Sequence, residues 1–401
     1  MQNKDTKIFR KTLKGMENSH KATIDLSLDR ILEVFKRLFR KKFSFKIIVV
    51  GGTNGKGSTV SLLENIYKVS KHKVGTFTSP HIFSFNERIR INGKNVSNHS
   101  IIKSLKKIDS VRGDITLTFF EYNTLIALLL FDSFKVDVAI LEVGLGGRLD
   151  AVNILQSDLS IITSIDKDHE RILGNTRDKI AIEKAGIMRR GKVSICGEQN
   201  PPRSLIAEAK KIGSKIEFVN NQYSGKIKLE GQHQRINAEI AKRAVEHLKK
   251  DLYISSSQIK FGISKTEITG RQQILEFNGK QFVIDVAHNP AAVKKLLETL
   301  NKFDGKFTAI FSALRDKDVK NMIKIIHHKI EKWLLVPIEE SRGMSSQDLQ
   351  KIFPKNIDIS LYSSTREAIE DSMSSKAKNI LVFGSFYTVS YALRELEILK
   401  T

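Results

Sequence analysis

A glycine-rich segment with a lysine and three hydroxyl residues carries the strongest chemical signal in the sequence. It reads GGTNGKGST over residues 51–59 and follows an apolar run. Glycines let backbone N–H groups approach phosphate oxygens, and the N-terminus of a following helix adds partial positive charge. Lys56 would contact the β- and γ-phosphates of a nucleotide, and Ser58 or Thr59 could reach a magnesium ion. Gly57, inserted after the lysine, departs from the strict motif. A simple glycine turn is the alternative, but strand, glycines, lysine and helix together favour a phosphate-binding loop.

Two further polar groups follow apolar strand-like runs. Glu142 ends the run Val136–Val143, and His169 lies just beyond the run Leu159–Ile165. Ligands bind at the carboxyl ends of parallel strands, and a carboxylate there is costly unless it is paired or bound to a metal. Oxygen donors with one imidazole and no thiolate suit Mg²⁺ better than zinc. The alternatives are a buried salt bridge for Glu142 and a surface position for His169.

A similar pattern recurs late in the chain, where Asp285 lies near the end of the run Gln281–Ala287 and His288, Asn289 and Pro290 follow it. Asn289 and Pro290 are explained as the N-cap and first residue of a helix. Asp285 and His288 have no such explanation, so they are candidates for contact with a ribose or a base.

Three residues are weak signals when taken alone. Arg271 follows Gly270, and Asn237 lies on an expected helix. Lys184 adjoins the apolar stripe of an expected helix over Thr176–Arg190, where a lysine usually extends its ammonium to solvent.

The elements that must position these residues alternate between β-branched runs and helical stretches. This pattern predicts an α/β protein with parallel sheets covered by helices. We expect a boundary near residues 265–270, with domains over 1–266 and 267–401. The first 45 residues and the stretch Ser79–Arg112 have weaker patterns and are expected to be helical or loop decoration. The expected strands are Lys46–Val50, Val136–Val143, Leu159–Ile165, Lys192–Gly197, Gln281–Ala287, Phe307–Ala313, Trp333–Ile338 and Asn379–Gly384.

The composition narrows the classes of function. The 401 residues include 67 Lys and Arg against 44 Asp and Glu, a net charge of +23. Such a field attracts nucleic acid, acidic membranes or anionic metabolites. The basic residues are spread thinly and are not interleaved with stacking aromatics, which disfavours nucleic acid as a partner. The longest apolar run, Leu125–Phe131, is too short to cross a bilayer. The one cysteine, Cys196, lies in a strand-like run and is expected to be a buried, inert thiol. We therefore expect a cytoplasmic enzyme that uses an anionic substrate.

Taken together, the motifs resemble the Mur ligase superfamily, and specifically the bifunctional dihydrofolate synthase/folylpolyglutamate synthase family. The resemblance extends from about residue 21 to 390. The segments that carry it, in order, are GGTNGKGST, TSPHIFSFNERIRI, LTFFEYNTL, LEVGLGGRLDAVN, ITSIDKDHERILG, IEKAGI, GRQQ, DVAHNP and FGSFYTV.

The resemblance implies a P-loop ATPase-like N-terminal domain with a mostly parallel sheet. It also implies a smaller Rossmann-like C-terminal domain that closes on ATP and binds glutamate. Lys184 would be carbamylated and join Ser79, Glu142 and His169 as ligands of two Mg²⁺ ions. The implied catalytic residues are Lys56, Glu142, His169 and Lys184. The implied ATP-binding residues are Asn54, Gly55, Lys56, Gly57 and Ser58, with Asn237, Arg271, Asp285 and His288 approaching from beyond the cleft.

The implied pterin substrate is held by three segments of the chain. Phe120 is the aromatic side chain expected to stack on the pterin ring. The segment Asp114–Phe120 looks like that of members able to hold dihydropteroate, which argues against polyglutamylation alone. The implied pterin residues are Asp25, Leu26, Ser27, Leu28, Thr118, Phe119, Phe120, Glu121, Leu149, Asp150 and Ala151.

The activity implied is ATP-dependent ligation of L-glutamate to dihydropteroate and to folates through an acyl phosphate. The expected partners are these small molecules, with no nucleic acid and no membrane, and the chain is expected to be a monomer. Three alternatives stay open: a Mur-type ligase for another carboxylate, a nucleic-acid-stimulated ATPase and a non-catalytic binding protein.

Overall fold

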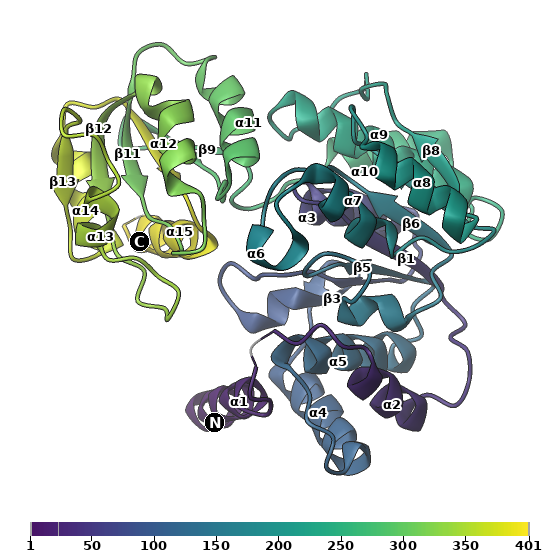
Figure 1. Cartoon of the computed structure of the whole chain (residues 1–401). Helices are drawn as coiled ribbons and strands as arrows, with labels where there is room; N and C mark the ends of the chain where they lie inside the picture. The colour runs from purple at the N-terminus through teal and green to yellow at the C-terminus, as the bar shows by residue number, and fades with distance from the viewer. Residues whose placement is uncertain (1, 23, 400–401) are drawn as a thin grey trace. The chain divides into compact units, whose positions relative to one another are not determined.

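The computed structural model describes residues 2–22 and 24–399, which form two compact units (Figure 1). The first unit comprises Met1–Asp166, Leu173–Lys226 and Arg235–Thr266. The second comprises Lys167–Ile172, Ile227–Gln234 and Glu267–Thr401. The last crossing between units falls at 266/267, but two short earlier segments, which we expected in the first domain, cluster with the second unit.

The first unit is built on an eight-stranded sheet in the order β4-β3-β2-β5-β1-β6-β7-β8. Strands β2, β5, β1, β6, β7 and β8 run parallel, whereas β3 and β4 are antiparallel additions at one edge. The strands are β1 (Lys46–Gly51), β2 (Val74–Phe77), β3 (Ile89–Ile91), β4 (Lys94–Asn95), β5 (Val138–Glu142), β6 (Leu159–Ile162), β7 (Val193–Cys196) and β8 (Lys215–Phe218).

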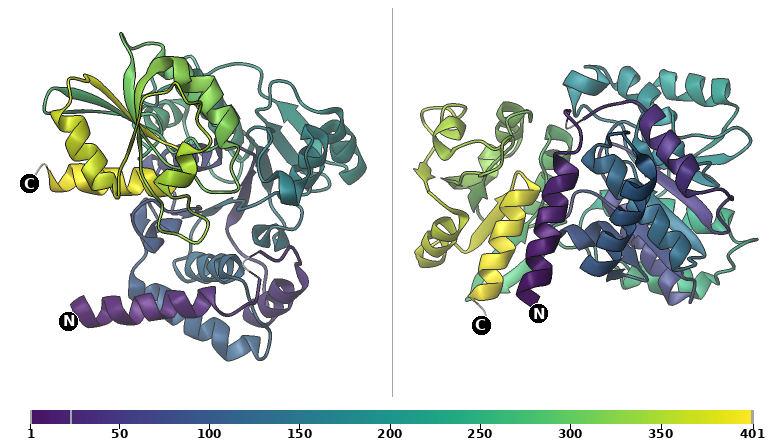
Figure 2. Two further views of the ribbon diagram at one scale, coloured as in Figure 1. Left: turned by 60° about the vertical axis from the view of Figure 1, so that its left-hand side comes forward. Right: turned by 90° about the horizontal axis from the view of Figure 1, so that it is seen from below.

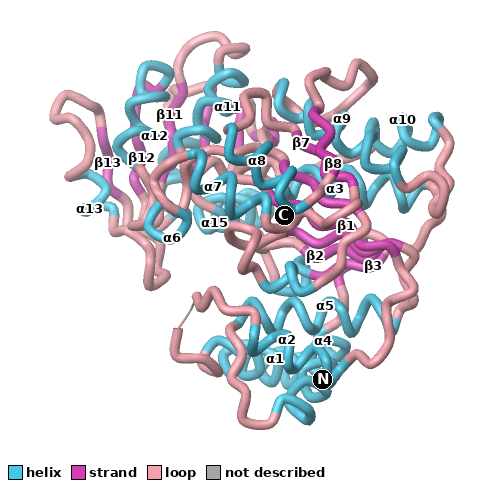
Figure 3. Tube along the Cα trace, turned by 45° about the vertical axis from the view of Figure 1, so that its right-hand side comes forward, coloured by secondary structure: helices cyan, strands magenta, loops and turns pink. Residues whose placement is uncertain are grey.

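Helices cover both faces of this sheet, as Figure 3 shows for α5 and α3. Side chains alternate between faces along a strand, so Ile47 and Val49 of β1 join the core beneath α5, and Ile48 and Val50 point to the other face. The helices are α1 (Gln2–Glu17), α2 (Asp29–Leu38), α3 (Lys56–Val69), α4 (Asn98–Arg112), α5 (Phe119–Ser133), α7 (Arg177–Ala185), α8 (Arg203–Ile212), α9 (Gln232–His247) and α10 (Ser256–Ser264), with short helices η1 (Phe85–Arg88) and η2 (Ala151–Ile154).

The N-terminal segment is part of the first unit's core. Helix α1 lies alongside α4 (Figure 2) and buries Phe9 and Met16. The expectation of decoration over Ser79–Arg112 was wrong in part, because this stretch contains β3 and β4 as well as α4. Strand β3 is held in place by the Arg90 guanidinium. This group forms hydrogen bonds with both carboxylate oxygens of Glu64 on α3, at 3.1 and 2.8 Å. That long-range pair anchors a strand too short to show a pattern.

The second unit is built on a six-stranded sheet in the order β13-β12-β11-β14-β10-β9, in which only β9 is antiparallel. Helices α11, α12 and α13 cover one face of it, and α14 and α15 lie against β11 and β14. The strands are β9 (Gln273–Phe277), β10 (Lys280–Ile284), β11 (Phe307–Phe311), β12 (Ile330–Leu335), β13 (Ile359–Leu361) and β14 (Asn379–Phe383). The helices are α6 (Glu170–Leu173), α11 (Pro290–Leu300), α12 (Val319–Ile326), η3 (His327–Lys329), α13 (Ser346–Gln350), α14 (Thr365–Ser374) and α15 (Phe386–Ile398).

The mixed α/β class with parallel-rich sheets is therefore confirmed, and each expected strand overlaps an observed one. Cys196 is buried in β7, and burial raises the pKa of its thiol to about 12, as expected for an inert group. Among the described residues, no helix is both long enough and apolar enough to cross a lipid bilayer.

Candidate active site

The glycine-rich loop connects β1 to α3, as predicted, and two of its glycines have no room for a side chain. Gly52 has a φ of +140°, and a Cβ there would lie 1.9 Å from Thr163 Oγ1. Gly55, the N-cap of α3, has a φ of +88°, and a Cβ would lie 2.8 Å from Asn237 Oδ1. Both positions therefore require glycine, and the backbone of the loop is left open for the close approach of a phosphate.

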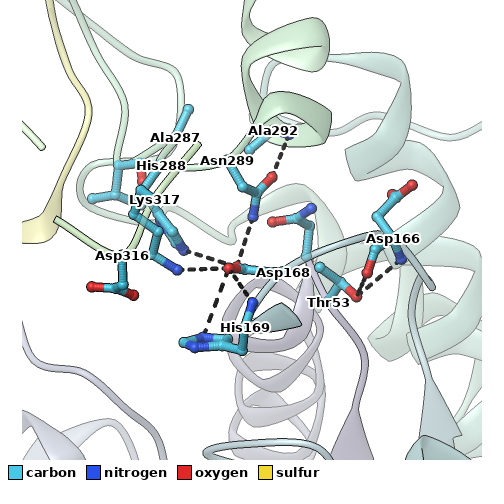
Figure 4. Close-up of polar contacts among 12 residues, drawn as sticks. Thr53, Asp166, Asp168, His169, Ala287, His288, Asn289, Ala292, Asp316 and Lys317 are labelled. Atoms are coloured by element: carbon cyan, nitrogen blue, oxygen red, sulfur yellow. Dashed lines mark hydrogen bonds and ion pairs between the residues drawn. The ribbon is translucent and has the colours of Figure 1, made fainter. Parts of the chain in front are cut away.

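The residues that follow β6 hold the glycine-rich loop in place through hydrogen bonds. The Thr53 hydroxyl donates to the Asp166 carbonyl and accepts its N–H, each at 3.0 Å (Figure 4). The Thr163 hydroxyl donates to the Asn54 carbonyl at 2.7 Å, and the Asn54 N–H donates to Ser164 Oγ at 3.0 Å. The loop is thus held by neutral hydrogen bonds within one unit.

Lys56 lies at the first helical position with its ammonium curled over the loop. It donates to the carbonyls of Gly52 and Thr53 at 3.0 and 3.2 Å. Ser58 and Thr59 are both buried in the first turn of α3. Thr59 Oγ1 has no hydrogen-bond partner. The Lys56 ammonium lies over a loop that leads into a helix N-terminus, the kind of position that attracts phosphate oxygens.

Glu142 lies beside this loop. It ends β5 in register with Val50 of β1 and is only 5% exposed. The N–H of Ser79, which follows β2, donates to Glu142 Oε2 at 3.2 Å. Because β2, β5 and β1 are adjacent parallel strands, Ser79, Glu142 and Lys56 share one sheet edge. Two of the expected metal ligands are therefore brought together next to the phosphate-binding loop.

Lys184 is buried rather than solvent-exposed, so the default expectation for a lysine beside an apolar stripe was wrong. Lys184 lies on α7 and is 3% exposed. Helix α7 packs closely against the loop after β5, and Gly147 permits this approach. A Cβ at Gly147 would lie 2.7 Å from the Glu183 carbonyl and 3.1 Å from Lys184 Cα. A buried lysine needs a compensating group or a chemical modification, since burying an ammonium is costly.

Asn237 belongs to the first unit and contacts Gly55, so the expectation that it approaches ATP from the far domain was wrong. It is 5% exposed on α9, and α9 packs against this unit's own core through Ile240, which contacts Gly197. Its amide faces the N-cap of α3, where it can be reached by a nucleotide bound at the loop.

The predicted pterin segments meet at the start of α5. Phe120 is half-buried against Gly144, where a Cβ would lie 2.7 Å from Phe120 Cζ, and its ring centroid is 5.5 Å from that of Phe77. Phe119 contacts the ring of Phe85 and the Arg88 guanidinium instead. Phe120 is therefore the aromatic residue next to the loop after β5.

Thr118 and Glu121 have a structural role that the sequence prediction did not separate from substrate binding. They form a capping box, in which the Thr118 N–H donates to Glu121 Oε2 at 2.6 Å and the Glu121 N–H donates to Thr118 Oγ1 at 3.3 Å. Glu121 is 3% exposed. These groups order the start of α5.

A charged network that sequence reasoning missed joins two of the pterin segments. The Arg30 guanidinium donates to Asp25 Oδ2 at 2.7 Å and to Glu121 Oε1 at 3.2 Å. His20 contacts the same Asp25 oxygen at 3.2 Å and Thr116 Oγ1 at 2.8 Å. The pairing of Arg30 with a carboxylate 91 residues away leaves no local signal in the sequence.

The third pterin segment forms a tight loop around Asp150. Its carboxylate accepts the N–H groups of Leu145 at 2.9 Å and Val152 at 3.0 Å. Burial raises the pKa of this carboxyl to about 6, against the lowering effect of these N–H groups. Leu149 is 39% exposed and Ala151 is buried. Leu149 is thus the accessible apolar side chain of this segment.

In the second unit, Asp285 and Arg271 lie close together. The Asp285 carboxylate accepts the N–H groups of Gln272 at 2.8 Å and Ala287 at 2.6 Å. Burial raises its pKa to about 6, and the Arg271 charge acts in the opposite direction. Arg271 lies over the Phe386 ring at 5.0 Å. Backbone N–H groups hold the carboxylate in place at the end of β10.

His288 and His169 converge on Asp168 in the second unit (Figure 4). His288 Nε2 is 3.7 Å from Asp168 Oδ2, and burial lowers the pKa of the His288 imidazole to about 4. The His169 N–H donates to Asp168 Oδ1 at 2.8 Å. Burial acts to raise the pKa of the Asp168 carboxyl, but Lys317, His169 and His288 together hold it below its usual range. As expected, Asn289 caps α11, accepting the Ala292 N–H at 2.8 Å.

The expected metal ligands are not all gathered in one unit. Ser79, Glu142 and Lys184 belong to the first, and His169 clusters with the second. Within residues 2–22 and 24–399, no group of three or more His, Cys, Asp or Glu side chains is arranged to hold a metal ion. The oxygen donors of Ser79 and Glu142 nevertheless fit Mg²⁺, which is usually bound by one or two protein carboxylates together with phosphates and water.

Family models match most of the chain. Residues 50–275 match the Mur ligase middle domain, and residues 270–386 match the glutamate ligase domain of Mur ligases. The two models together include the phosphate-binding loop, Glu142, Lys184 and the cluster around Asp168.

Individual relatives are similar over nearly the full length. The dihydrofolate synthase/folylpolyglutamate synthase of Haemophilus influenzae is 36% identical, covering 97% of this chain and 98% of its own. E. coli FolC, solved with DHPP and ADP, is 33% identical with a TM-score of 0.92 and 98% of each chain covered. A bifunctional folylpolyglutamate synthase/dihydrofolate synthase, solved with Mn, AMPPNP and L-glutamate, is 32% identical with a TM-score of 0.87. The match covers 97% of this chain and 98% of that one. The chain therefore belongs to the dihydrofolate synthase/folylpolyglutamate synthase family of the Mur ligases.

Proposed function

We propose that this protein is an ATP-dependent ligase that joins L-glutamate to dihydropteroate, forming dihydrofolate, and to folates, forming polyglutamates. The observation that carries the proposal is the shared sheet edge of the first unit. There the loop with Lys56 lies beside Glu142 and Ser79, and Phe120 lies against the loop that follows Glu142. Relatives of the same family bind DHPP with ADP, and AMPPNP with L-glutamate.

The chemistry follows from what each group can do. The pteroate or folate carboxylate attacks the γ-phosphorus of ATP, ADP leaves, and an acyl phosphate forms. The amino group of L-glutamate then attacks the acyl carbon, loses a proton, and expels inorganic phosphate. Lys56 and the loop N–H groups neutralise charge on the phosphoryl oxygens, which is the main contribution a protein makes to such a transfer.

We assign the nucleotide to Asn54, Gly55, Lys56, Gly57, Ser58 and Asn237 in the first unit, and to Arg271, Asp285 and His288 in the second. Ser79, Glu142 and His169 are the proposed ligands of Mg²⁺. Bound there, the ion would polarise the phosphate oxygens and offset their charge. A carbamate on Lys184 would convert its buried cation into an anion able to support a second ion. Intact-protein mass spectrometry at neutral pH tests this modification.

The pterin ring is proposed to contact Phe120 and Leu149. Asp25, Leu26, Ser27, Leu28, Thr118, Phe119, Glu121, Asp150 and Ala151 shape the surrounding walls. We further propose that the enzyme works as a cytoplasmic monomer on anionic small molecules, to which its net charge of +23 is suited. Light scattering of the purified protein tests the monomer.

Product analysis tests the function. Purified protein with ATP, Mg²⁺, dihydropteroate and L-glutamate should release ADP, phosphate and dihydrofolate in equal amounts. Replacing dihydropteroate by a folate should yield the product extended by one glutamate. Absence of amide product with both pterin substrates would refute the proposal. ATP hydrolysis stimulated by DNA or RNA instead would support the nucleic-acid-dependent alternative.

A further inference from the structure

The chain enters the second unit for only six residues, Lys167–Ile172, before it returns to the first. So short a segment cannot form a core of its own, so specific contacts must hold it. The side chain of Asp168 is 10% exposed and supplies those contacts. Figure 4 shows the side chains of Lys317, Asn289 and His288 directed at this carboxylate.

Lys317 makes the shortest of the contacts. Its Nζ lies 2.7 Å from Asp168 Oδ1, and its side chain is 5% exposed. The lysine lies between β11 and α12 in a turn fixed by its own backbone: its N–H donates to the Leu314 carbonyl at 3.1 Å, and its carbonyl accepts the Val319 N–H at 2.9 Å. The ammonium is therefore presented from a rigid element.

The second oxygen of Asp168 is also occupied. Asn289 Nδ2 donates to Asp168 Oδ2 at 3.1 Å while Asn289 Oδ1 caps α11. His288 Nδ1 contacts the Val286 carbonyl at 2.8 Å, which turns Nε2 toward the same oxygen. Two segments of the second unit, the turn that contains Lys317 and the segment that contains His288 and Asn289, thus contact the same carboxylate.

The same carboxylate also contacts the backbone of the next residue, His169. Asp168 Oδ1 accepts the N–H of His169 at 2.8 Å, and His169 has a φ of +52°, a conformation that side-chain-bearing residues avoid unless their surroundings impose it. The Lys317 ammonium shares the oxygen that receives this N–H. The backbone of His169 is therefore set by a carboxylate that Lys317 holds.

We propose that Lys317 is a positioning residue for the ligase: through Asp168 it fixes segment 167–172 to the second unit and sets the direction of His169. The inference rests on the proposed function only in giving His169 a role as metal ligand. A buried ion pair is a poor source of stability compared with apolar packing, but removing one partner leaves the other charge buried without compensation. A geometric role for the pair is consistent with its place beside a strained residue.

The test uses the full-length chain with Lys317→Met, Asp168→Asn and the double variant. Lys317→Met keeps the length of the side chain but removes its charge. Hydrogen–deuterium exchange of peptides spanning 167–172 should rise at least about tenfold in each single variant, because each breaks the same buried pair. Peptides of the phosphate-binding loop and of β11 should not change. The double variant should exchange no faster than the faster single variant.

A matched control is Arg342→Met. Arg342 pairs with Asp316, the neighbour of Lys317, in the same unit, but it is 54% exposed. It should leave exchange of 167–172 at the wild-type rate. The conservative variant Lys317→Arg retains a cation for Asp168 and should restore slow exchange.

Binding of Mn²⁺ with ADP, followed by electron paramagnetic resonance, gives a second readout. We expect weaker binding in Lys317→Met and Asp168→Asn and unchanged binding in Arg342→Met. Unchanged exchange of 167–172 in both single variants would overturn the proposal. So would a defect of Lys317→Met confined to the KM for L-glutamate, because it would place the ammonium on substrate. If the protein lacked ligase activity altogether, the proposed function would fail while the exchange result still stood.

Discussion

The phosphate-binding loop of the first unit and the Asp168 cluster of the second fix their residues by different means. The loop is held by glycines and by neutral hydrogen bonds to the end of the adjacent strand, such as that between Thr53 and Asp166. The cluster is held by a buried ion pair between Asp168 and Lys317, which lie 149 residues apart. Both arrangements use partners that are distant in the chain, but the loop can be recognised from a local motif, whereas nothing in the sequence near Asp168 or Lys317 marks their pairing.

Removing the lysine of the loop should have the largest effect. Lys56→Ala is expected to lower kcat/KM by about 10²–10³-fold, because preorganised charge on the phosphoryl oxygens contributes that much in comparable sites. ADP release in a coupled assay measures it. Because the ammonium donates to carbonyls of the loop itself, those of Gly52 and Thr53, we expect the melting temperature to change little. Full turnover of the variant would contradict the role assigned to Lys56.

The glycines of the loop give the next largest effect. Gly55→Ala should weaken ATP binding by about tenfold or more, because a positive φ and a clash with Asn237 each cost on the order of 1 kcal/mol or more. Calorimetric titration with ATP measures the loss. Gly191→Ala is the matched control, since its φ is +70° but a Cβ there meets nothing within 4 Å. Equal losses in the two variants would show that backbone strain matters rather than the loop's contacts.

The network around Arg30 tests whether a buried charge can act at a distance in the first unit as we propose for the second. Arg30→Met should raise the KM for dihydropteroate by about tenfold and leave the KM for ATP unchanged, since it leaves Asp25 and the buried Glu121 without their cation. Steady-state kinetics measures both constants. Arg366→Met, which removes an exposed arginine that pairs with Glu370 and Glu395, is the control. A parallel rise in the KM for ATP would argue against a local effect.

The smallest expected effect is on the pH dependence of stability. In the folded chain, burial raises the pKa of the Asp150 carboxyl from its ordinary value of 3.8 to about 6. Between these values the folded state holds more protons than the unfolded state, so stability falls as pH rises from about 4 to 6. Asp150→Asn should flatten this slope and change the melting temperature by a few degrees across that interval. Calorimetry at several pH values measures it, and an unchanged slope would mean that Asp150 is not the group responsible.

Much of the fold could be predicted because strong hydrophobic patterns mark it. The central strands β1, β5 and β6 are buried on both faces and appear in the sequence as continuous apolar runs. The sequence analysis missed β2, β3, β4, β8, β9 and β13. All but β9 have four residues or fewer, too few to show a pattern, and no residue of β9 is fully buried. The residues around Lys184 alone indicated a solvent-exposed lysine, and only the family resemblance set it apart, because its burial depends on Gly147, which lies in another segment and lets α7 approach.

By itself, the sequence determined the phosphate-binding loop, the strand ends that carry Glu142 and Asp285, and the family, because these depend on residues adjacent in the chain. The tertiary structure alone decided that Asn237 contacts Gly55, that Arg30 joins Asp25 to Glu121, and that segment 167–172 packs with the second unit. The physical reason is the same in each case. A charge or amide that finds its partner across tens of residues imposes no periodicity on the chain around it, so only folding shows which partner it meets.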